Sequence, residues 1–177
     1  YDHLDVESLR ILDPGTHLIS PLGYDGIFED LGMGNRTRLD WYGIHKDGQS
    51  EVVFLPCRHW TMRNPITGPN RDLWGAYLIR GASGRNVFLS GDTAYFDRYA
   101  EIGEEFGIDL AVFSLGAYEP RWFMAGSHIN PEETVRAFCE LRARRLLVVH
   151  WGCFRLGDEP VHLPPLAMRR EMERAGL

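Results

Sequence analysis

Residues 86–93 read NVFLSGDT, and the fold can be worked out from this stretch of the sequence. The apolar run 87–89 predicts a strand, and Ser90 and Gly91 end it. Glycine permits the tight turn that a chain needs at such a point. Asp92 follows at once, so the pattern predicts a carboxylate held on a tight turn at the end of a rigid strand.

Two other apolar runs end in the same way. The run EVVFLPCRH places His59 just past a predicted strand, and the run LLVVH ends in His150. Nitrogen and oxygen donors that converge from rigid strands are what a metal centre requires. Asp2 and His3, in the first five residues YDHLD, precede a predicted helix and add two more candidate ligands.

The donor types indicate which metal to expect. Imidazole and carboxylate without thiolate suit zinc, with iron or manganese as competitors. Two metals about 3.5–4 Å apart would make a hydrolytic centre, and Asp92 is the natural bridge between them. Simpler readings stay open, because Asp2 could be a terminal acid, His59 a loop residue, and His150 a core histidine.

Predicted strands alternate with predicted helices, as in a layered α/β or α+β domain. Asn130 and Glu133 flank Pro131 as a capping box does, which marks the start of a helix. The polar loop 61–71 is longer than most connections. The predicted strands cover 16–20, a hairpin over 38–56, 73–80, 86–91, 108–116 and 144–152. The predicted helices cover 6–12, 24–32, 96–107, 131–143 and 163–177. The strand over 108–116 shows little alternation, which predicts burial on both faces.

The composition predicts one globular domain. The chain has 177 residues, 44% of them hydrophobic, and a net charge of −6, which argues against a nucleic-acid binder. No run approaches the ~20 apolar residues of a membrane span. The three cysteines form no CxxC, so reduced thiols and a cytoplasmic location are expected. Peripheral membrane contact and homo-oligomer formation stay open.

The strings YDHLD, SGDTAYF, LGAYEPRWFM, SHINPEE and VVHWGCF resemble the metallo-β-lactamase superfamily. Within it they resemble the branch of the N-acylphosphatidylethanolamine-hydrolysing phospholipase D and its bacterial relatives. The resemblance implies an αββα sandwich with metals at one edge of two facing sheets. Residues 1–3 match the last three positions of the leading motif H-x-H-x-D-H. We therefore expect residues 1–177 to be the C-terminal portion of a single domain, without its N-terminal strands. An apolar sheet edge should then lie exposed, so the chain should be poorly soluble or pair with something.

The resemblance also implies a ligand set. One metal would be bound by the two absent histidines together with His59 and the bridging Asp92. The other would be bound by Asp2, His3, Asp92 and His150, all of which are present. The full-length protein would then hold two zinc ions, with one complete site in this sequence.

Asp92 and His128 are the expected catalytic residues. The implied mechanism is attack on phosphorus by a hydroxide that bridges the two metals. His128, in SHINPEE, matches a histidine near the phosphate, where it would bind or polarise a substrate oxygen. The alternative is a histidine that flanks a helix and has no special role. Arg121 would hold phosphate oxygens or would form an ordinary salt bridge.

A lipid substrate needs apolar surface beside the metals. Trp122, Phe123 and Met124, in RWFM, are the expected substrate-binding residues, and Trp60 and Trp151 would wall the site. The alternative is that all five pack in the core.

Three functions follow from these observations. The first is a zinc-dependent phosphodiesterase that acts on N-acyl phospholipids or related diesters. The second is a lactonase or another metallo-hydrolase of the same fold, since fold does not fix substrate. The third is a non-catalytic metal-binding or interaction module. The expected partner is a small molecule or a phospholipid, and no nucleic acid.

Overall fold

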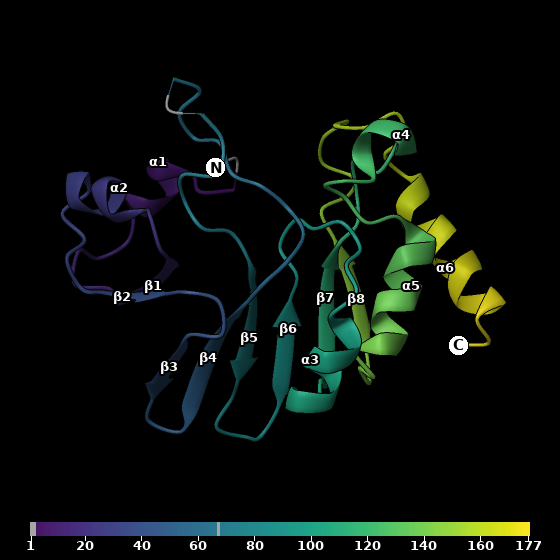
Figure 1. Cartoon of the computed structure of the whole chain (residues 1–177), viewed down its shortest axis with the longest axis horizontal. Coiled ribbons are helices and arrows are strands. Elements are labelled where there is room, and N and C mark those ends of the chain that lie inside the picture. The colour runs from purple at the N-terminus through teal and green to yellow at the C-terminus, as the bar shows by residue number, and fades with distance from the viewer. Residues whose placement is uncertain (1–2, 67) are drawn as a thin grey trace.

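Two sheets organise the chain in the computed structural model, which describes residues 3–66 and 68–177 (Figure 1). The large sheet has six strands in the order β3-β4-β5-β6-β7-β8. Its strands are β3 (Ile44–Asp47), β4 (Ser50–Leu55), β5 (Ala76–Arg80), β6 (Asn86–Leu89), β7 (Leu110–Ser114) and β8 (Leu146–Val149). Strands β3 to β6 pair antiparallel, whereas β6, β7 and β8 pair parallel. The small sheet pairs β1 (Leu18–Pro21) with β2 (Arg36–Leu39) in parallel.

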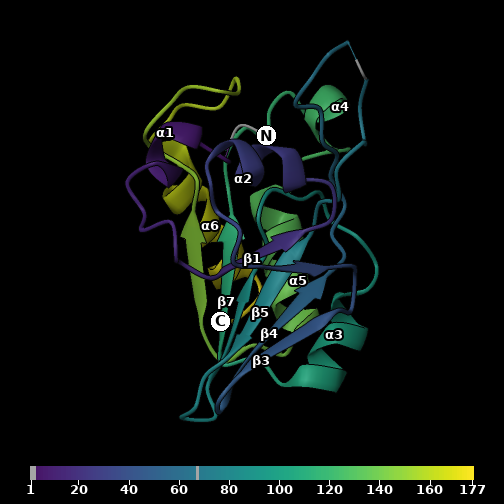
Figure 2. The same ribbon diagram turned by 90° about the vertical axis from the view of Figure 1, so that its left-hand side faces the viewer.

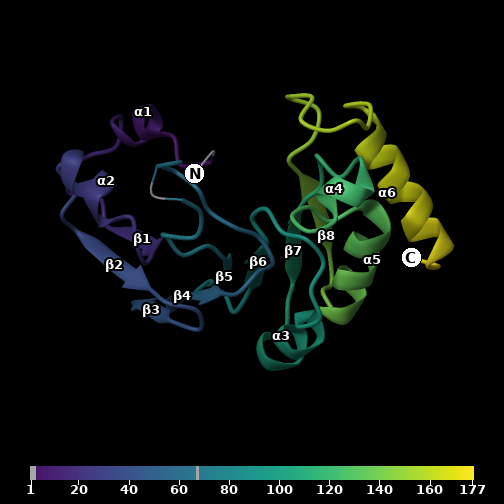
Figure 3. The ribbon, with the colours of Figure 1, turned by 45° about the horizontal axis from the view of Figure 1, so that its top comes forward.

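Helices cover one face of the large sheet, and the small sheet lies on the other side (Figures 1 and 3). The helices on the covered face are α3 (Tyr99–Phe106), α5 (Pro131–Glu140) and α6 (Leu163–Arg174). Helices α1 (Val6–Leu9) and α2 (Asp25–Asp30) lie on the side of the small sheet, and α4 (Arg121–Met124) lies beyond the ends of β7 and β8 (Figures 1 and 3). Helices α3 and α5 pack against the large sheet, and α6 packs against α5. Seen from the side, β1 and β2 run across the large sheet in front of β5 (Figure 2). This layered arrangement is the α/β fold class expected from the sequence.

The core forms where alternate residues of the strands face the helices. Phe88 on β6 and Phe113 on β7 are both buried, and Tyr99 on α3 lies against them. Ile102 and Leu141 close the same cluster from the helix side. The aromatic pairs meet edge-on or tilted, which is the arrangement that aromatic rings prefer.

The second face of the large sheet is only partly covered. Burial alternates along β7, so Ala111 and Phe113 are buried whereas Val112 is half-buried. The prediction of burial on both faces of this strand is therefore wrong, because helices cover one face only. On the edge strand β8, Leu147 is 49% exposed and Val149 is 38% exposed.

The segment over 38–56 forms a shorter hairpin than predicted. Strands β3 and β4 meet around the two-residue turn at Gly48 and Gln49, as the Lys-Asp-Gly-Gln sequence predicts. The first residues of the predicted hairpin, 38 and 39, belong to β2, which pairs with β1 instead. Tyr42 adopts a φ of 64° and donates its backbone N–H to the Phe54 carbonyl at 2.6 Å, so a turn separates the two strands.

Each of the five predicted helices is shorter than predicted, although α1, α5 and α6 begin at the predicted residue. Helix α1 stops at residue 9 rather than 12, since Ile11 is 84% exposed and gains nothing by continuing the helix. Helix α3 begins at residue 99 rather than 96, with no side-chain cap. Helix α5 has the predicted capping box between Asn130 and Glu133. The capping box, a contact between side chains and backbone close in sequence, thus explains why the start of α5 could be predicted.

Candidate metal centre

Parallel strands bring two of the predicted ligands to one edge of the large sheet. Strands β6 and β8 flank β7 and run in the same direction, so their carboxyl ends lie at the same edge of the sheet (Figure 1). Asp92 follows the end of β6 by three residues, and His150 directly follows β8. Gly91 has a φ of 60°, the left-handed conformation that glycine adopts without strain, so the predicted tight turn is present.

His150 also has left-handed backbone, with a φ of 65°. Non-glycine residues rarely adopt this conformation, and those that do are often at functional sites. A Cβ atom on Gly116 would lie 2.2 Å from the His150 carbonyl oxygen. Only glycine at position 116 therefore lets the end of β7 pass the turn that carries His150.

Three donor side chains gather at this edge. His3 Nε2 lies 2.9 Å from Asp92 Oδ2, and His150 Nε2 lies 3.6 Å from Asp92 Oδ1. One ligand atom from each of the three residues lies within 4.8 Å of the other two. The Asp92 side chain is 5% exposed, whereas that of His3 is 58% exposed. Two imidazoles and a buried carboxylate at this spacing fit a divalent metal ion.

Charge at the centre favours the ionised form of Asp92. Burial alone raises the pKa of this carboxyl group, but the charges of His150 and His3, the hydrogen bond from His3 and the charge of His128 together outweigh burial. The pKa of Asp92 therefore lies below its ordinary value. A carboxylate is the form that binds a metal.

His59 lies near this group but is not part of it. It lines the same cavity as His3, Asp92 and His150, yet the three-residue ligand group does not include it. His59 Nδ1 donates to the Ser127 carbonyl oxygen at 3.0 Å. Because a carbonyl only accepts, this bond leaves Nε2 of His59 as the nitrogen able to bind a metal.

His128 lies between the other imidazoles. Its ring centroid is 5.4 Å from that of His59 and 6.2 Å from that of His150. The loop between α4 and α5 carries it, so it reaches the centre from outside the sheet. The loop thus brings the residue expected to contact substrate next to two expected ligands.

The structure separates the remaining predicted residues. Asp2 lies outside the described residues. Trp122 is 86% exposed and Phe123 is 67% exposed, on α4 at the same end of the molecule, and Met124 is half-buried there (Figure 1). Trp60 and Trp151 are also partly exposed, at 37% and 40%. The alternative in which all five pack in the core is therefore wrong.

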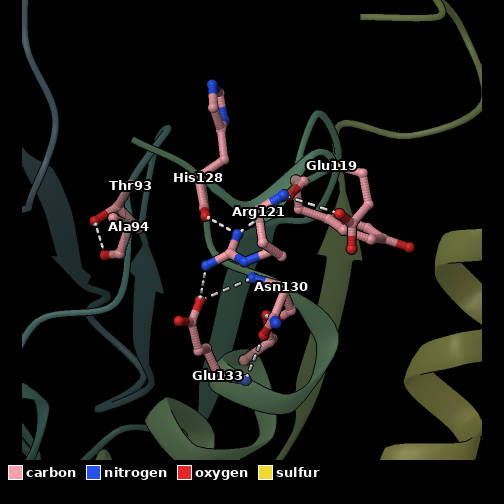
Figure 4. Close-up of polar contacts among 9 residues, drawn as sticks. Thr93, Ala94, Glu119, Arg121, His128, Asn130 and Glu133 are labelled. Atoms are coloured by element: carbon pink, nitrogen blue, oxygen red, sulfur yellow. Dashed lines mark hydrogen bonds and ion pairs between the residues drawn. The ribbon is translucent and has the colours of Figure 1, made fainter. Parts of the chain in front are cut away.

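Arg121 takes the second of its two predicted roles. It forms an ion pair with Glu133, with 2.8 Å between Nη2 and Oε2, and the remaining hydrogen bonds of its guanidinium go to backbone carbonyls (Figure 4). Its side chain does not line the cavity beside the ligands. The ordinary salt bridge is confirmed, and the role in holding phosphate oxygens is not supported.

Sequence reasoning missed several residues that support the ligands. Ser127 orients His59, and its hydroxyl accepts a hydrogen bond from Trp60 Nε1 at 3.2 Å. Cys57 donates its thiol to the Asp92 carbonyl oxygen at 3.6 Å. Thr93 Oγ1 accepts from the Arg58 backbone N–H at 3.1 Å. Cys57 and Thr93 lie within two residues of predicted ligands in the sequence, whereas no pattern marks Ser127.

A cavity of about 640 Å³ lies between the large sheet and the small sheet. The three gathered donors and His59 line it together with apolar side chains from both sheets, from α2 and from the segment before β5. These apolar side chains include Leu18, Phe28, Phe54, Leu73 and Trp74. A volume of this size beside convergent polar groups is typical of small-molecule sites. In the described part of the chain, no helix is long and apolar enough to span a membrane.

Comparison with known proteins identifies the family. Residues 1–151 match the family model described as the Beta-lactamase superfamily domain. The chain belongs to the metallo-β-lactamase superfamily. This match confirms the resemblance seen in the sequence. It also confirms the predictions of a metal-dependent hydrolase and of a mixed α/β fold. Divalent metal binding is the property that this fold family implies.

Relatives within the superfamily are similar over most of this chain. The N-acyl-phosphatidylethanolamine-hydrolyzing phospholipase D 1 of Caenorhabditis elegans is 33% identical over 186 residues, which cover 97% of this chain and 52% of that protein. The mitochondrial N-acyl-phosphatidylethanolamine-hydrolyzing phospholipase D of Saccharomyces cerevisiae is 32% identical, over 89% of this chain and 36% of that protein. The chain therefore spans about half the length of the first relative and about a third of the second.

A solved structure agrees on the fold. The metallo hydrolase Igni18 from Ignicoccus hospitalis superposes with a TM-score of 0.66 at 19% identity. The match covers 89% of this chain and 61% of that one. At this identity the likeness concerns the superfamily fold alone.

Proposed function

We propose that this protein is a zinc-dependent phosphodiesterase of the N-acylphosphatidylethanolamine phospholipase D type. The observation that carries the proposal is the gathering of His3, Asp92 and His150 at the carboxyl edge of β6 and β8. The named relatives, at 32% and 33% identity, supply the substrate class. A cytoplasmic location with peripheral membrane contact belongs to the same proposal.

The ligand residues would divide between two ions. His3, Asp92 and His150 would hold one ion, with Asp2 as the fourth expected ligand. Asp92 and His59 would contribute to the other. Bound zinc would supply an acidified water as nucleophile and would offset charge on the phosphoryl oxygens. The hydrogen bond between His59 and Ser127 keeps Nε2 of His59 available for this task.

His128 would recognise the substrate phosphate. Its ring lies beside those of His59 and His150, so an imidazole N–H would reach a non-bridging oxygen of a diester bound at the centre. Donors placed where negative charge develops lower the barrier of phosphoryl transfer. We therefore assign to His128 the stabilisation of charge on phosphate rather than metal binding.

The apolar side chains of α4 would meet the lipid. Trp122 and Phe123 are exposed on α4, which lies at the end of the large sheet where β6 and β8 end (Figure 1). Aromatic side chains favour the boundary between water and hydrocarbon. The protein would thus approach the membrane with the same edge of the sheet that would bind and cleave the headgroup.

The direct test is hydrolysis of N-acylphosphatidylethanolamine in vesicles, with the protein purified as its gene encodes it. We expect release of an N-acylethanolamine and a phosphatidic acid. Asp92→Asn should lower turnover by at least about 100-fold, because a ligand matters more than the outer partners of a metal site. Arg142→Gln is the matched control, since it removes only a surface pair with Glu104.

Three outcomes would overturn the proposal. Turnover of a lactone without turnover of any diester would favour another hydrolase of the same fold. Absence of all turnover in protein that contains its metal would favour a binding module. Diesterase activity that survives Asp92→Asn would place the chemistry elsewhere in the molecule.

A further inference from the structure

Arg121 is turned back toward the start of α5, although its neighbours on α4 are exposed. Its Nη1 donates to the His128 carbonyl oxygen at 2.8 Å and to the Tyr118 carbonyl oxygen at 3.3 Å. Its Nη2 donates to Glu133 Oε2 at 2.8 Å. Figure 4 shows the guanidinium between the carbonyl of His128 and the carboxylate of Glu133, with the His128 ring pointing away from it.

The far side of this contact is rigid. The Glu133 oxygen that pairs with Arg121 also accepts the Asn130 backbone N–H at 3.1 Å. Asn130 Oδ1 in turn accepts the Glu133 backbone N–H at 2.9 Å, which completes the capping box of α5. The arginine is therefore fixed to the first turn of a helix that packs in the core.

The backbone at residues 127–129 is held from other directions as well. The His128 N–H donates to the Met124 carbonyl oxygen at 2.9 Å, and the Ile129 N–H donates to the Thr93 carbonyl oxygen at 2.8 Å. Thr93 directly follows Asp92. The carbonyl of Ser127, the residue before His128, accepts the hydrogen bond that orients His59. Because the contacts of Ser127 and Ile129 hold the residues on either side, loss of the Arg121 bond would act on residue 128 and its ring.

We propose that Arg121 is a positioning residue that holds the His128 backbone so that the imidazole stays beside His59 and His150. The proposal rests on the proposed function only in treating His128 as a substrate ligand. The planar guanidinium holds its N–H donors in a fixed fork, so Nη1 reaches the backbone carbonyls while Nη2 reaches the carboxylate of Glu133. A lysine has a single charged nitrogen, so it could keep the pair with Glu133 but would give up the carbonyl of His128.

The kinetic test is a double-mutant cycle between Arg121 and His128. Arg121→Gln should lower kcat for a phosphodiester by about 100-fold, more than it raises KM, because small misplacements of a reacting group have effects of this size. In the His128→Ala background the same substitution should change kcat by less than about twofold. Arg121→Lys should fall between the wild type and Arg121→Gln. Equal losses from Arg121→Gln with and without His128 would overturn the proposal.

The structural test does not depend on activity. In protein labelled with ¹³C-histidine, the ring signal of His128 is the one that disappears in His128→Ala. We expect this signal to shift or broaden in Arg121→Gln and Arg121→Lys and to stay unchanged in Arg142→Gln. An unchanged signal in both Arg121 variants would contradict the positioning role, even if the protein hydrolyses no diester. A changed signal without diesterase activity would leave positioning intact and would reject the proposed function alone.

Discussion

At the scale of single residues, the centre depends on backbone conformations that few side chains tolerate. Gly91 turns the chain so that Asp92 faces inward, and His150 itself adopts left-handed backbone. Gly116 leaves the space that the His150 carbonyl occupies. Unusual backbone conformation thus places these two predicted ligands, and such conformations are common at functional sites.

Substitution of Gly116 tests this dependence on backbone. An added methyl group would lie 2.2 Å from the His150 carbonyl oxygen, so Gly116→Ala should destabilise the fold. We expect a loss of about 1–3 kcal/mol in the free energy of unfolding, measured by denaturant titration. Gly34→Ala is the control, because nothing lies within 4 Å of the added atom. Equal stability of both variants would contradict the close packing at His150.

The three thiols should differ in reactivity. Burial raises the pKa of the Cys57 thiol to about 12. A hydrogen bond with Thr93 lowers this pKa, and the charge of Asp92 raises it. Only the thiolate reacts with disulfide reagents, so at pH 8 Cys57 should be inert in the folded protein. Cys139 and Cys153 are exposed and should react at once. Three fast thiols in a titration of native protein would contradict the burial of Cys57.

At the scale of elements, the loop between β7 and α5 carries the parts that finish the site. Helix α4 presents apolar side chains, the next residues present His128, and α5 anchors both through its capping box. The cap was predictable because all of its atoms come from four consecutive residues. The contact of Arg121 with His128 was not, since only the folded loop brings a side chain to a carbonyl seven residues later.

The capping box of α5 should contribute measurably to stability. Asn130→Ala removes the acceptor of the Glu133 N–H, and we expect a loss of about 1 kcal/mol in the free energy of unfolding. Asn130→Ser keeps an acceptor and should be close to the wild type. Denaturant unfolding of the two variants measures the difference. If serine and alanine cost the same, the side-chain cap does not stabilise the helix.

At the scale of the whole molecule, helix α4 lies at the end of the large sheet where β6 and β8 end (Figure 1). The sequence predicted the layered class and the positions of Asp92 and His150 after strands, because strand ends can be recognised from apolar runs. It did not predict that β2 would pair with β1, or that one face of β7 would stay half-covered. Both depend on which segments meet in space, and local residue patterns do not contain that information.

The exposed aromatic side chains should matter only for a membrane substrate. Trp122→Ala should lower activity on vesicles about tenfold, because the apolar contact of one large side chain is worth more than about 1 kcal/mol. Activity on a short soluble diester should stay unchanged. Leu177→Ala is the control, since it shortens another exposed apolar side chain. Equal losses of Trp122→Ala on both substrates would mean that Trp122 acts through the structure of the site.

The central claim is that His3, Asp92 and His150 bind a divalent metal. Elemental mass spectrometry of the purified protein, beside Asp92→Asn, His150→Ala and the control Arg142→Gln, tests it most directly. We predict bound zinc in the wild type and in the control, and its loss in both ligand variants. Wild-type protein without divalent metal, or full metal content in Asp92→Asn and His150→Ala, would contradict the account.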